Sequence, residues 1–222
     1  MKDLASSSVL SRAFLAATLT VLACLPRLWV WQERSPPLFF FAGMLGWSAF
    51  AMWAFILAWH EKHTSDPPFA RNVKPLDWAW VTAGGGLASV CFYFWSDPVI
   101  RRLFPNELPI SFPETSAFIL FYLSFTQLFL VFAPVAFFAR LGARRRVLIT
   151  LVVGLNVIVL LIKLTSSAEQ PSAALTVFLL VSRAVLSGIS TTLYLRGGIW
   201  LVWWWALLLQ LRLFIPISEN PF

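Results

Sequence analysis

The chain has 222 residues, of which 59% are hydrophobic and only 12% are charged, and its net charge is +7. A soluble domain carries about twice that charged fraction, and several apolar runs here reach the ~20 residues that cross a bilayer as a helix. Basic loops between apolar spans set orientation and contact anionic lipid, which argues against nucleic-acid binding. We expect an all-α, polytopic transmembrane helical bundle that forms one integral membrane domain over residues 1–222.

The apolar runs predict seven spans. In chain order their expected bounds are 13–31, 38–59, 78–95, 116–139, 147–164, 173–195 and 198–211. The last is only just long enough to cross, so six full spans plus a short or re-entrant segment is the alternative. Gly84-Gly85-Gly86 in the third span indicates close helix packing or a flexible kink, and Pro134 predicts a kink in the fourth.

Loop charges orient the bundle. Seven spans place most Lys and Arg side chains on one side, including the run Arg144, Arg145 and Arg146, and more of the acids, such as Glu107 and Glu114, on the other. The positive-inside bias therefore predicts a cytoplasmic N-terminus and an outside C-terminus. We interpret the Arg144–Arg146 run as an electrostatic contact with anionic lipid or with an acidic partner.

Both histidines of the chain lie in His60-Glu61-Lys62-His63. Their spacing is three residues, whereas the HExxH pair that binds zinc from one helix face is spaced by four. The sequence favours a solvated helix end here, and we predict no metal site. The two cysteines, Cys24 and Cys91, lie inside apolar runs and are interpreted as core residues rather than as a disulfide.

Arg183 lies about ten residues into the sixth span, near mid-bilayer at ~1.5 Å per residue. A charge there costs at least ~2.5–3.5 kcal/mol, yet no Asp or Glu lies within the seven expected spans. The intramembrane partners left to it are the amides of Gln127, Asn156 and Gln210, backbone carbonyls, lipid or another chain. Alternatively, Arg183 snorkels to the interface, or the span is shifted by one turn.

Trp203, Trp204 and Trp205 follow one another in the last span, and Phe39-Phe40-Phe41 opens the second. Consecutive side chains spread over about 200° of a helix, more than one helix–helix seam covers. We therefore expect some of the indoles to face lipid, a bound hydrophobic ligand or a neighbouring subunit.

The stretch LYLRGGIW at residues 193–200, followed by an apolar helix, resembles the last core helix of the CPBP family of CAAX-protease and bacteriocin-processing intramembrane proteases. In that family an "LYLRTGSLW"-like turn leads into a helix bearing HxxxN, and those two positions fall here on Ala206 and Gln210. FARLG at residues 138–142 likewise resembles the family's "RRLG"-like loop. The resemblance covers about Ser116 to Phe214.

The residues that define the chemistry of that family are replaced in this chain. Counting from the basic loop, the glutamates of EExxxR fall near Thr126 and Gln127, its arginine near Val131, and the histidine of FxxxH near Ile158. The resemblance implies a mechanism in which a carboxylate activates water, and none of these side chains can do so near neutral pH. We predict no catalytic residue and no proteolysis.

The leading hypothesis is a non-catalytic accessory, assembly or scaffold subunit of a larger membrane complex on a degenerate CPBP-like scaffold, with other membrane subunits and lipids as partners. The alternative is a membrane binder or transporter of a hydrophobic small molecule such as a lipid, quinone or carotenoid. An active intramembrane protease with a non-standard site is the third. No cofactor is predicted, although bound lipid or carotenoid is compatible with the sequence. Size, charge bias and the resemblance together suggest a bacterial inner membrane.

Overall fold

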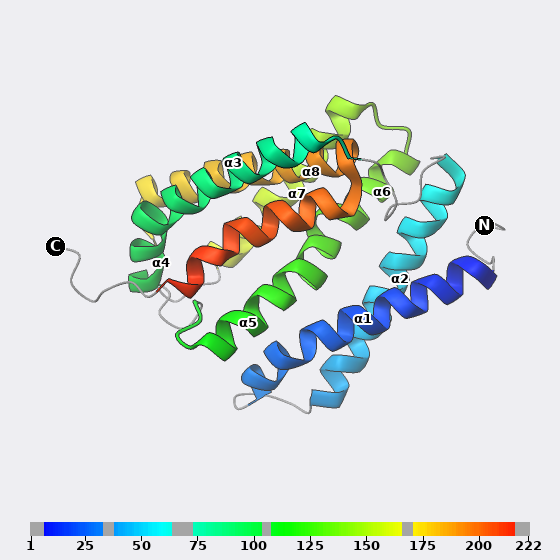
Figure 1. The fold of residues 1–222 in the computed structure, drawn as a ribbon, viewed down its shortest axis with the longest axis horizontal. Helices are drawn as coiled ribbons and strands as arrows, with labels where there is room; N and C mark the ends of the chain where they lie inside the picture. The colour runs from blue at the N-terminus through cyan, green and yellow to red at the C-terminus, as the bar shows by residue number, and fades with distance from the viewer. Residues whose placement is uncertain (1–6, 33–37, 64–72, 104–107, 166–170, 216–222) are drawn as a thin grey trace.

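A computed structural model describes residues 7–32, 38–63, 73–103, 108–165 and 171–215 of the protein (Figure 1). These residues are helical apart from short connections, and the described part of the chain contains no β-strand. Five helical stretches are long and apolar enough to cross a membrane: Ser7–Val30, Leu38–His60, Phe112–Arg140, Arg145–Thr165 and Ala173–Phe214. The all-α class is therefore confirmed, and the five stretches fit a membrane protein.

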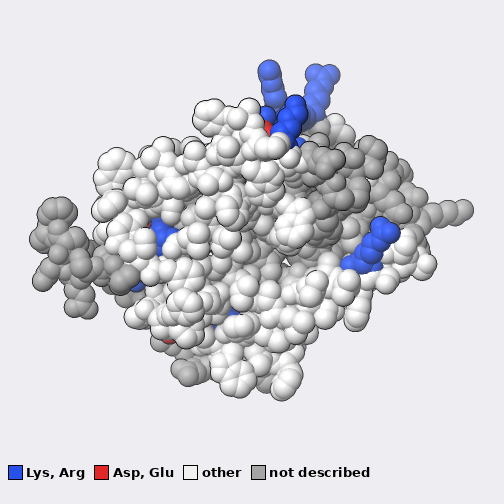
Figure 2. Space-filling model, viewed as in Figure 1, with Lys and Arg blue, Asp and Glu red and all other residues white. Residues whose placement is uncertain are grey.

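The surface agrees with that class. Figure 2 shows a face that is almost entirely free of charged side chains, with Lys and Arg standing out mainly at its edges. Large apolar side chains, among them Phe39, Trp47 and Phe94, are exposed on the outside of the molecule. Soluble monomers rarely expose apolar surface on this scale, so a lipid environment explains it.

The helices lie close to the expected spans. In chain order they are α1 (Ser7–Gln32), α2 (Leu38–His63), α3 (Pro75–Cys91), α4 (Asp97–Leu103), α5 (Phe112–Phe121), α6 (Ala133–Arg140), α7 (Arg145–Thr165) and α8 (Ala173–Leu211). A π-helical segment, η2 (Phe92–Ser96), joins α3 to α4 without a break. Pro75 lies in the first turn of α3, where a backbone N–H would have no hydrogen-bond partner within the helix, so the absence of that N–H in proline costs nothing. The proline therefore marks where the helix begins.

The helix of the expected fourth span contains two π-helical segments, η3 (Tyr122–Thr126) and η4 (Leu128–Phe132), between α5 and α6. Pro134 follows them in the first turn of α6. A proline cannot donate the normal helical hydrogen bond, and a π-turn is one way for a helix to absorb that loss. Asn156 on α7 donates its side-chain amide to the Leu130 carbonyl at 2.8 Å, which ties α7 to this widened segment.

Helix α8 is two helices joined by a sharp turn. Gly198 has φ 73° and ψ −161°, outside the helical region, in a backbone conformation that essentially only glycine adopts. Figure 1 shows the chain reversing there, from the yellow-to-orange part of α8 into the orange-to-red part. We refer to residues 173–197 as the first arm of α8 and to residues 199–211 as its second arm.

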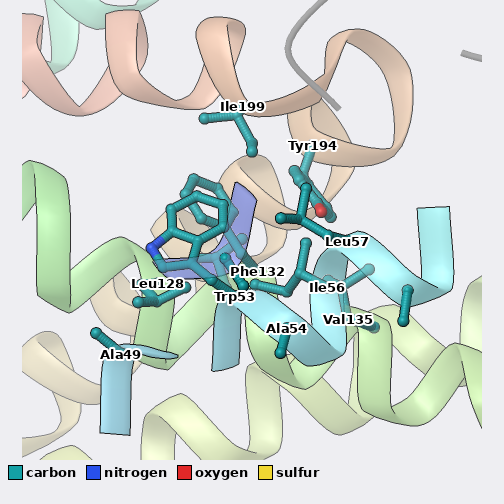
Figure 3. Close-up of a cluster of buried hydrophobic side chains, with 14 of the residues drawn as sticks. Ala49, Trp53, Ala54, Ile56, Leu57, Leu128, Phe132, Val135, Tyr194 and Ile199 are labelled. Carbon is teal, nitrogen blue, oxygen red and sulfur yellow. The ribbon is translucent and has the colours of Figure 1, made fainter. Parts of the chain in front are cut away.

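The main core lies where α2, the α5–α6 helix and α8 meet (Figure 3). Trp53 of α2 lies beside Phe132, with ring centroids 6.4 Å apart, and Phe132 stacks on Tyr194 of α8 at 5.0 Å. A second cluster joins α3 to the second arm of α8 through Val81 and Trp205. The aromatic side chains thus fill the space between helices that are far apart in the sequence.

The triple glycine of α3 packs against the second arm of α8. A Cβ on Gly85 would lie 2.9 Å from Leu208 Cδ1 and 3.3 Å from Trp205 Cε3, whereas a Cβ on Gly86 would meet nothing within 4 Å. The expected close packing therefore depends on Gly85, since the Leu208 and Trp205 side chains occupy the space that a Cβ there would need.

We expect Gly85→Ala to destabilise the protein by about 1–2 kcal/mol, because the added methyl overpacks a tight helix contact. Gly86→Ala is the matched control and should be neutral or slightly stabilising, since the same methyl meets open space. Thermal unfolding of both purified variants in mild detergent measures the difference. Equal midpoints for the two would contradict the packing role of Gly85.

Candidate functional site: an indole-lined cavity and a cavity lined by Arg183

A cavity of about 430 Å³ lies between α1, α2, α3, the α5 helix and the second arm of α8. Five indoles line it, together with aliphatic side chains and the hydroxyls of Thr20 and Ser124. The five are Trp53, Trp78, Trp200, Trp203 and Trp204. Cavities of this size and apolar character, with a few polar groups, are typical of small-molecule sites.

Hydrogen bonds hold two of these indoles in place. Trp53 Nε1 donates to Thr20 Oγ1 at 3.0 Å, and Trp204 Nε1 donates to Thr82 Oγ1 at 2.9 Å. The N–H groups of Trp53 and Trp204 are thereby used within the protein, and these two rings present apolar faces to the cavity. The walls of the cavity are fixed by neighbouring helices rather than by an occupant.

The three consecutive tryptophans have different surroundings. Trp203 and Trp204 line the cavity, while Trp205 is buried in the cluster between α3 and α8. Sequence analysis predicted that the three rings would face different surroundings, but a single sequence does not show which ring meets which neighbour.

A second, smaller cavity of about 160 Å³ is lined by Arg183 and Gln210. Its other polar lining residues are Ser96, Tyr122, Ser182 and Arg212. It lies between the two arms of α8, the α3–α4 helix, the π-segment η3 and α7. Among the described residues Arg183 forms no ion pair and no hydrogen bond, and the Gln210 side chain forms no hydrogen bond either.

The other two amides named as partners for Arg183 lie elsewhere. Neither Gln127 nor Asn156 lines the Arg183 cavity. Gln127 is buried between the two π-segments, and its Oε1 has no hydrogen-bond partner in the described part of the chain. Asn156 instead donates to the backbone carbonyls of Leu130 and Val152. Of the three amides, Gln210 alone shares a cavity with Arg183.

Two ion pairs join α3–α4 to α8, and sequence analysis had not paired them. Asp97 is 1% exposed, and its carboxylate accepts from Arg212 Nε at 2.8 Å and from Nη2 at 3.1 Å. Asp77 pairs with Arg196 at 2.6 Å, where the arginine side chain is 61% exposed. With seven spans, Asp77 just before the third span and Arg196 between the sixth and seventh spans fall on the same side of the membrane, and this is the one signal in the sequence for that pair.

His60 is buried, and its Nε2 lies 2.9 Å from the Tyr194 hydroxyl. The prediction of a solvated helix end is therefore wrong for His60, because α2 continues past the expected span and carries the ring into the core. The side chains of Glu61, Lys62 and His63 lie outside the described residues. The described residues contain no group of His, Cys, Asp and Glu that could hold a metal ion.

The positions on which the expected resemblance places the family's catalytic residues differ in their surroundings. Gln127, Val131, Ala206 and Gln210 are buried, whereas Ile158 is on the outer surface with 55% of its area exposed. Arg144, Arg145 and Arg146 are exposed at the start of α7, where contact with lipid or a partner is sterically open. Cys24 is buried and Cys91 is exposed.

Comparison with family models, with curated proteins and with solved structures finds no match to this chain. Its function must therefore be argued from its own geometry. The described residues offer two sites, the indole-lined cavity and the Arg183 cavity.

Proposed function

We propose that this chain is a multi-pass membrane protein that binds a hydrophobic small molecule, such as a lipid, quinone or carotenoid, in the indole-lined cavity. The observation that carries the proposal is the cavity of about 430 Å³ walled by five indoles from three parts of the chain. Indole faces stack on flat or extended apolar molecules. The hydroxyls of Thr20 and Ser124 donate to the backbone carbonyls of Ala16 and Leu120, so the cavity offers a ligand mainly apolar contact.

We propose further that the chain crosses the membrane seven times, with a cytoplasmic N-terminus in a bacterial inner membrane. The two ion pairs support α3 as a span. The twenty positions from Asp77 to Asp97 correspond to ~30 Å of helix at ~1.5 Å per residue, which matches the thickness of the bilayer core. The Arg144–Arg146 run supports the orientation, because it falls on the side that the positive-inside rule makes cytoplasmic.

We propose no catalytic activity for this chain, and a degenerate CPBP-like core over about residues 116–214. The sharp turn at Gly198 directly after the LYLRG stretch supports the resemblance. The buried side chains at the positions of the family's acids and bases, Gln127 and Ala206 among them, offer no proton acceptor for water near neutral pH. Cleavage of a CAAX-type peptide by the purified protein would overturn this part of the proposal.

An accessory or scaffold subunit is the second candidate function. A groove of about 410 Å³ runs between α1 and α2, where Gly43 and Gly46 lie between Phe14, Trp47 and Phe50. Small residues beside large ones are typical of surfaces where another apolar helix packs. Native mass spectrometry in mild detergent separates the two functions: a stoichiometric partner chain favours the subunit, and a monomer carrying a lipophilic mass favours the binder.

We expect Ala23→Phe to remove the bound lipophilic molecule. Ala23 lines the cavity from α1, so a phenyl ring there fills space that the ligand needs. Native mass spectrometry of the variant should show the mass of the bare chain, with occupancy reduced about tenfold or more, equivalent to ~1.4 kcal/mol.

Leu15→Phe is the matched control, because Leu15 lies on the same helix with 62% of its area exposed. It should retain the bound mass at the wild-type level. If Ala23→Phe retains the bound mass and unfolds at the wild-type midpoint, the ligand lies outside the cavity and the proposal is wrong.

A further inference from the structure

We propose that the Arg183 cavity binds the oxyanion of a phosphate monoester, as a site separate from the indole-lined cavity. The cavity is small, about 160 Å³, which suits a head group rather than an acyl chain. Six of its lining residues are polar or charged and six are apolar, whereas the larger cavity has no charged residue in its lining. The inference goes beyond the proposed function, because none of the residues that line this cavity lines the indole-lined one.

The charge of the cavity favours an anion. Two guanidinium groups line it, and Arg212 is already neutralised by the buried Asp97 carboxylate. Arg183 has no carboxylate partner among the described residues, so a net positive charge remains. A cation in an apolar bundle is stable only with a counter-charge or water, and a bound anion supplies the counter-charge.

The hydrogen-bond donors favour phosphate over carboxylate. Gln210 is 8% exposed, and its amide forms no hydrogen bond in the described part of the chain. The hydroxyls of Ser96, Ser182 and Tyr122 line the same cavity. With the planar fork of Arg183 these groups offer more donors than the two oxygens of a carboxylate can use. The three terminal oxygens of a phosphate monoester can accept from all of them.

The place of the cavity in the fold favours a lipid as the source of the phosphate. Arg212 and Asp97 mark one end of the α3–α4 contact with α8. Arg183 lies 15 positions before the Gly198 turn and Arg212 14 positions after it, so the two guanidinium groups lie at similar depths on the two arms. A head group held between the two arginines would remain within reach of the bilayer surface while its chains stay among the apolar side chains. Phosphatidic acid has this chemistry, and inorganic phosphate shares only its oxyanion.

The test is native mass spectrometry of the full chain in neutral detergent, titrated with phosphatidic acid and, for comparison, with phosphatidylcholine. We expect one phosphatidic acid to bind in preference to phosphatidylcholine. Arg183→Gln and Gln210→Leu should each weaken it about tenfold or more, the effect of losing a charge-assisted hydrogen bond. Arg12→Gln is the matched control, because it removes the same charge from an exposed position on α1 and should leave the preference intact.

A third titration adds inorganic phosphate as a competitor. Displacement of phosphatidic acid at millimolar phosphate assigns the site to a soluble phosphate, and retention assigns it to the lipid. Equal binding of both lipids, or wild-type binding by Gln210→Leu and Arg183→Gln, would overturn the site. Gln210→Leu keeps the net charge and tests the same cavity if Arg183→Gln does not fold. Ala23→Phe should bind phosphatidic acid normally, so failure of one site is distinguishable from failure of the other.

Discussion

Replacing Asp97 with asparagine is expected to destabilise the folded protein by about 3–5 kcal/mol, the usual cost of breaking a buried ion pair from one side. Asp97 is 1% exposed, and both of its oxygens accept hydrogen bonds from Arg212. Asparagine keeps one acceptor but loses the charge, so the guanidinium stays buried without a counter-ion. Arg212 cannot easily leave, because it also donates to the Leu209 carbonyl and lies over the Phe92 ring.

The measurement is the thermal unfolding midpoint of the purified variant in mild detergent, which should fall by roughly 10 °C. Asp77→Asn is the matched control. It breaks the same kind of pair, but Arg196 is 61% exposed, and exposed pairs contribute about 0–1 kcal/mol. Similar losses in both variants would show that burial of the Asp97 pair is not what makes it important.

A double variant separates the charge from the geometry. Asp97→Asn combined with Arg212→Gln removes both charges and leaves two amides of similar size. We expect it to recover most of the stability lost in Asp97→Asn alone, because the main cost in the single variant is the uncompensated cation.

The ends of the spans were predictable because short local signals fix them. Apolar runs of nearly bilayer length set the middle of each helix, and capping residues set the beginnings. Ser111 accepts from the Glu114 N–H and Ser172 from the Leu175 N–H, as serine commonly does at the N-cap. Helix α8 accordingly begins at the expected residue, Ala173, whereas α5 begins at Phe112, four residues before the expected start of its span.

The similar depth of Arg183 and Gln210 in the helical bundle was also predictable from the sequence. A chain that reverses at Gly198 brings residues at similar distances before and after the turn to similar depths, and both residues lie 12 to 15 positions from it. Gln210 was named as one of three possible amide partners for Arg183, and the two line one cavity. Their side chains are not joined by a hydrogen bond in the structure, which leaves both available to a ligand.

Helix neighbours were not predictable from one sequence. Asp97 falls just beyond the expected third span, and nothing in its local sequence indicates that Arg212 lies against it. The same holds for the tryptophans. The helical period of 3.6 residues predicts that Trp203 and Trp205 point in different directions, but it does not show which helix each ring contacts. The close approach of Gly85 to Leu208 and Trp205 decides that Trp205 is the buried one.

The turn within α8 places both arms and therefore both cavities. Residues of the second arm line the indole-lined cavity, and residues of both arms line the Arg183 cavity. The turn depends on Gly198, whose φ of 73° and ψ of −161° are accessible essentially to glycine alone, because a Cβ at such a conformation clashes with its own backbone.

We expect Gly198→Ala to destabilise the protein by about 2–3 kcal/mol and to weaken both ligand sites together, since the strain is relieved only by moving one arm of α8 against the other. Gly43→Ala is the control, because Gly43 is helical and a Cβ there meets nothing within 4 Å. The unfolding midpoint measures the first effect, and native mass spectrometry of the lipophilic mass and of added phosphatidic acid measures the second. A Gly198→Ala protein with wild-type stability and both ligands bound would mean that the turn does not fix the position of the two arms relative to each other. Loss of one ligand alone would mean that only one cavity depends on that relative position.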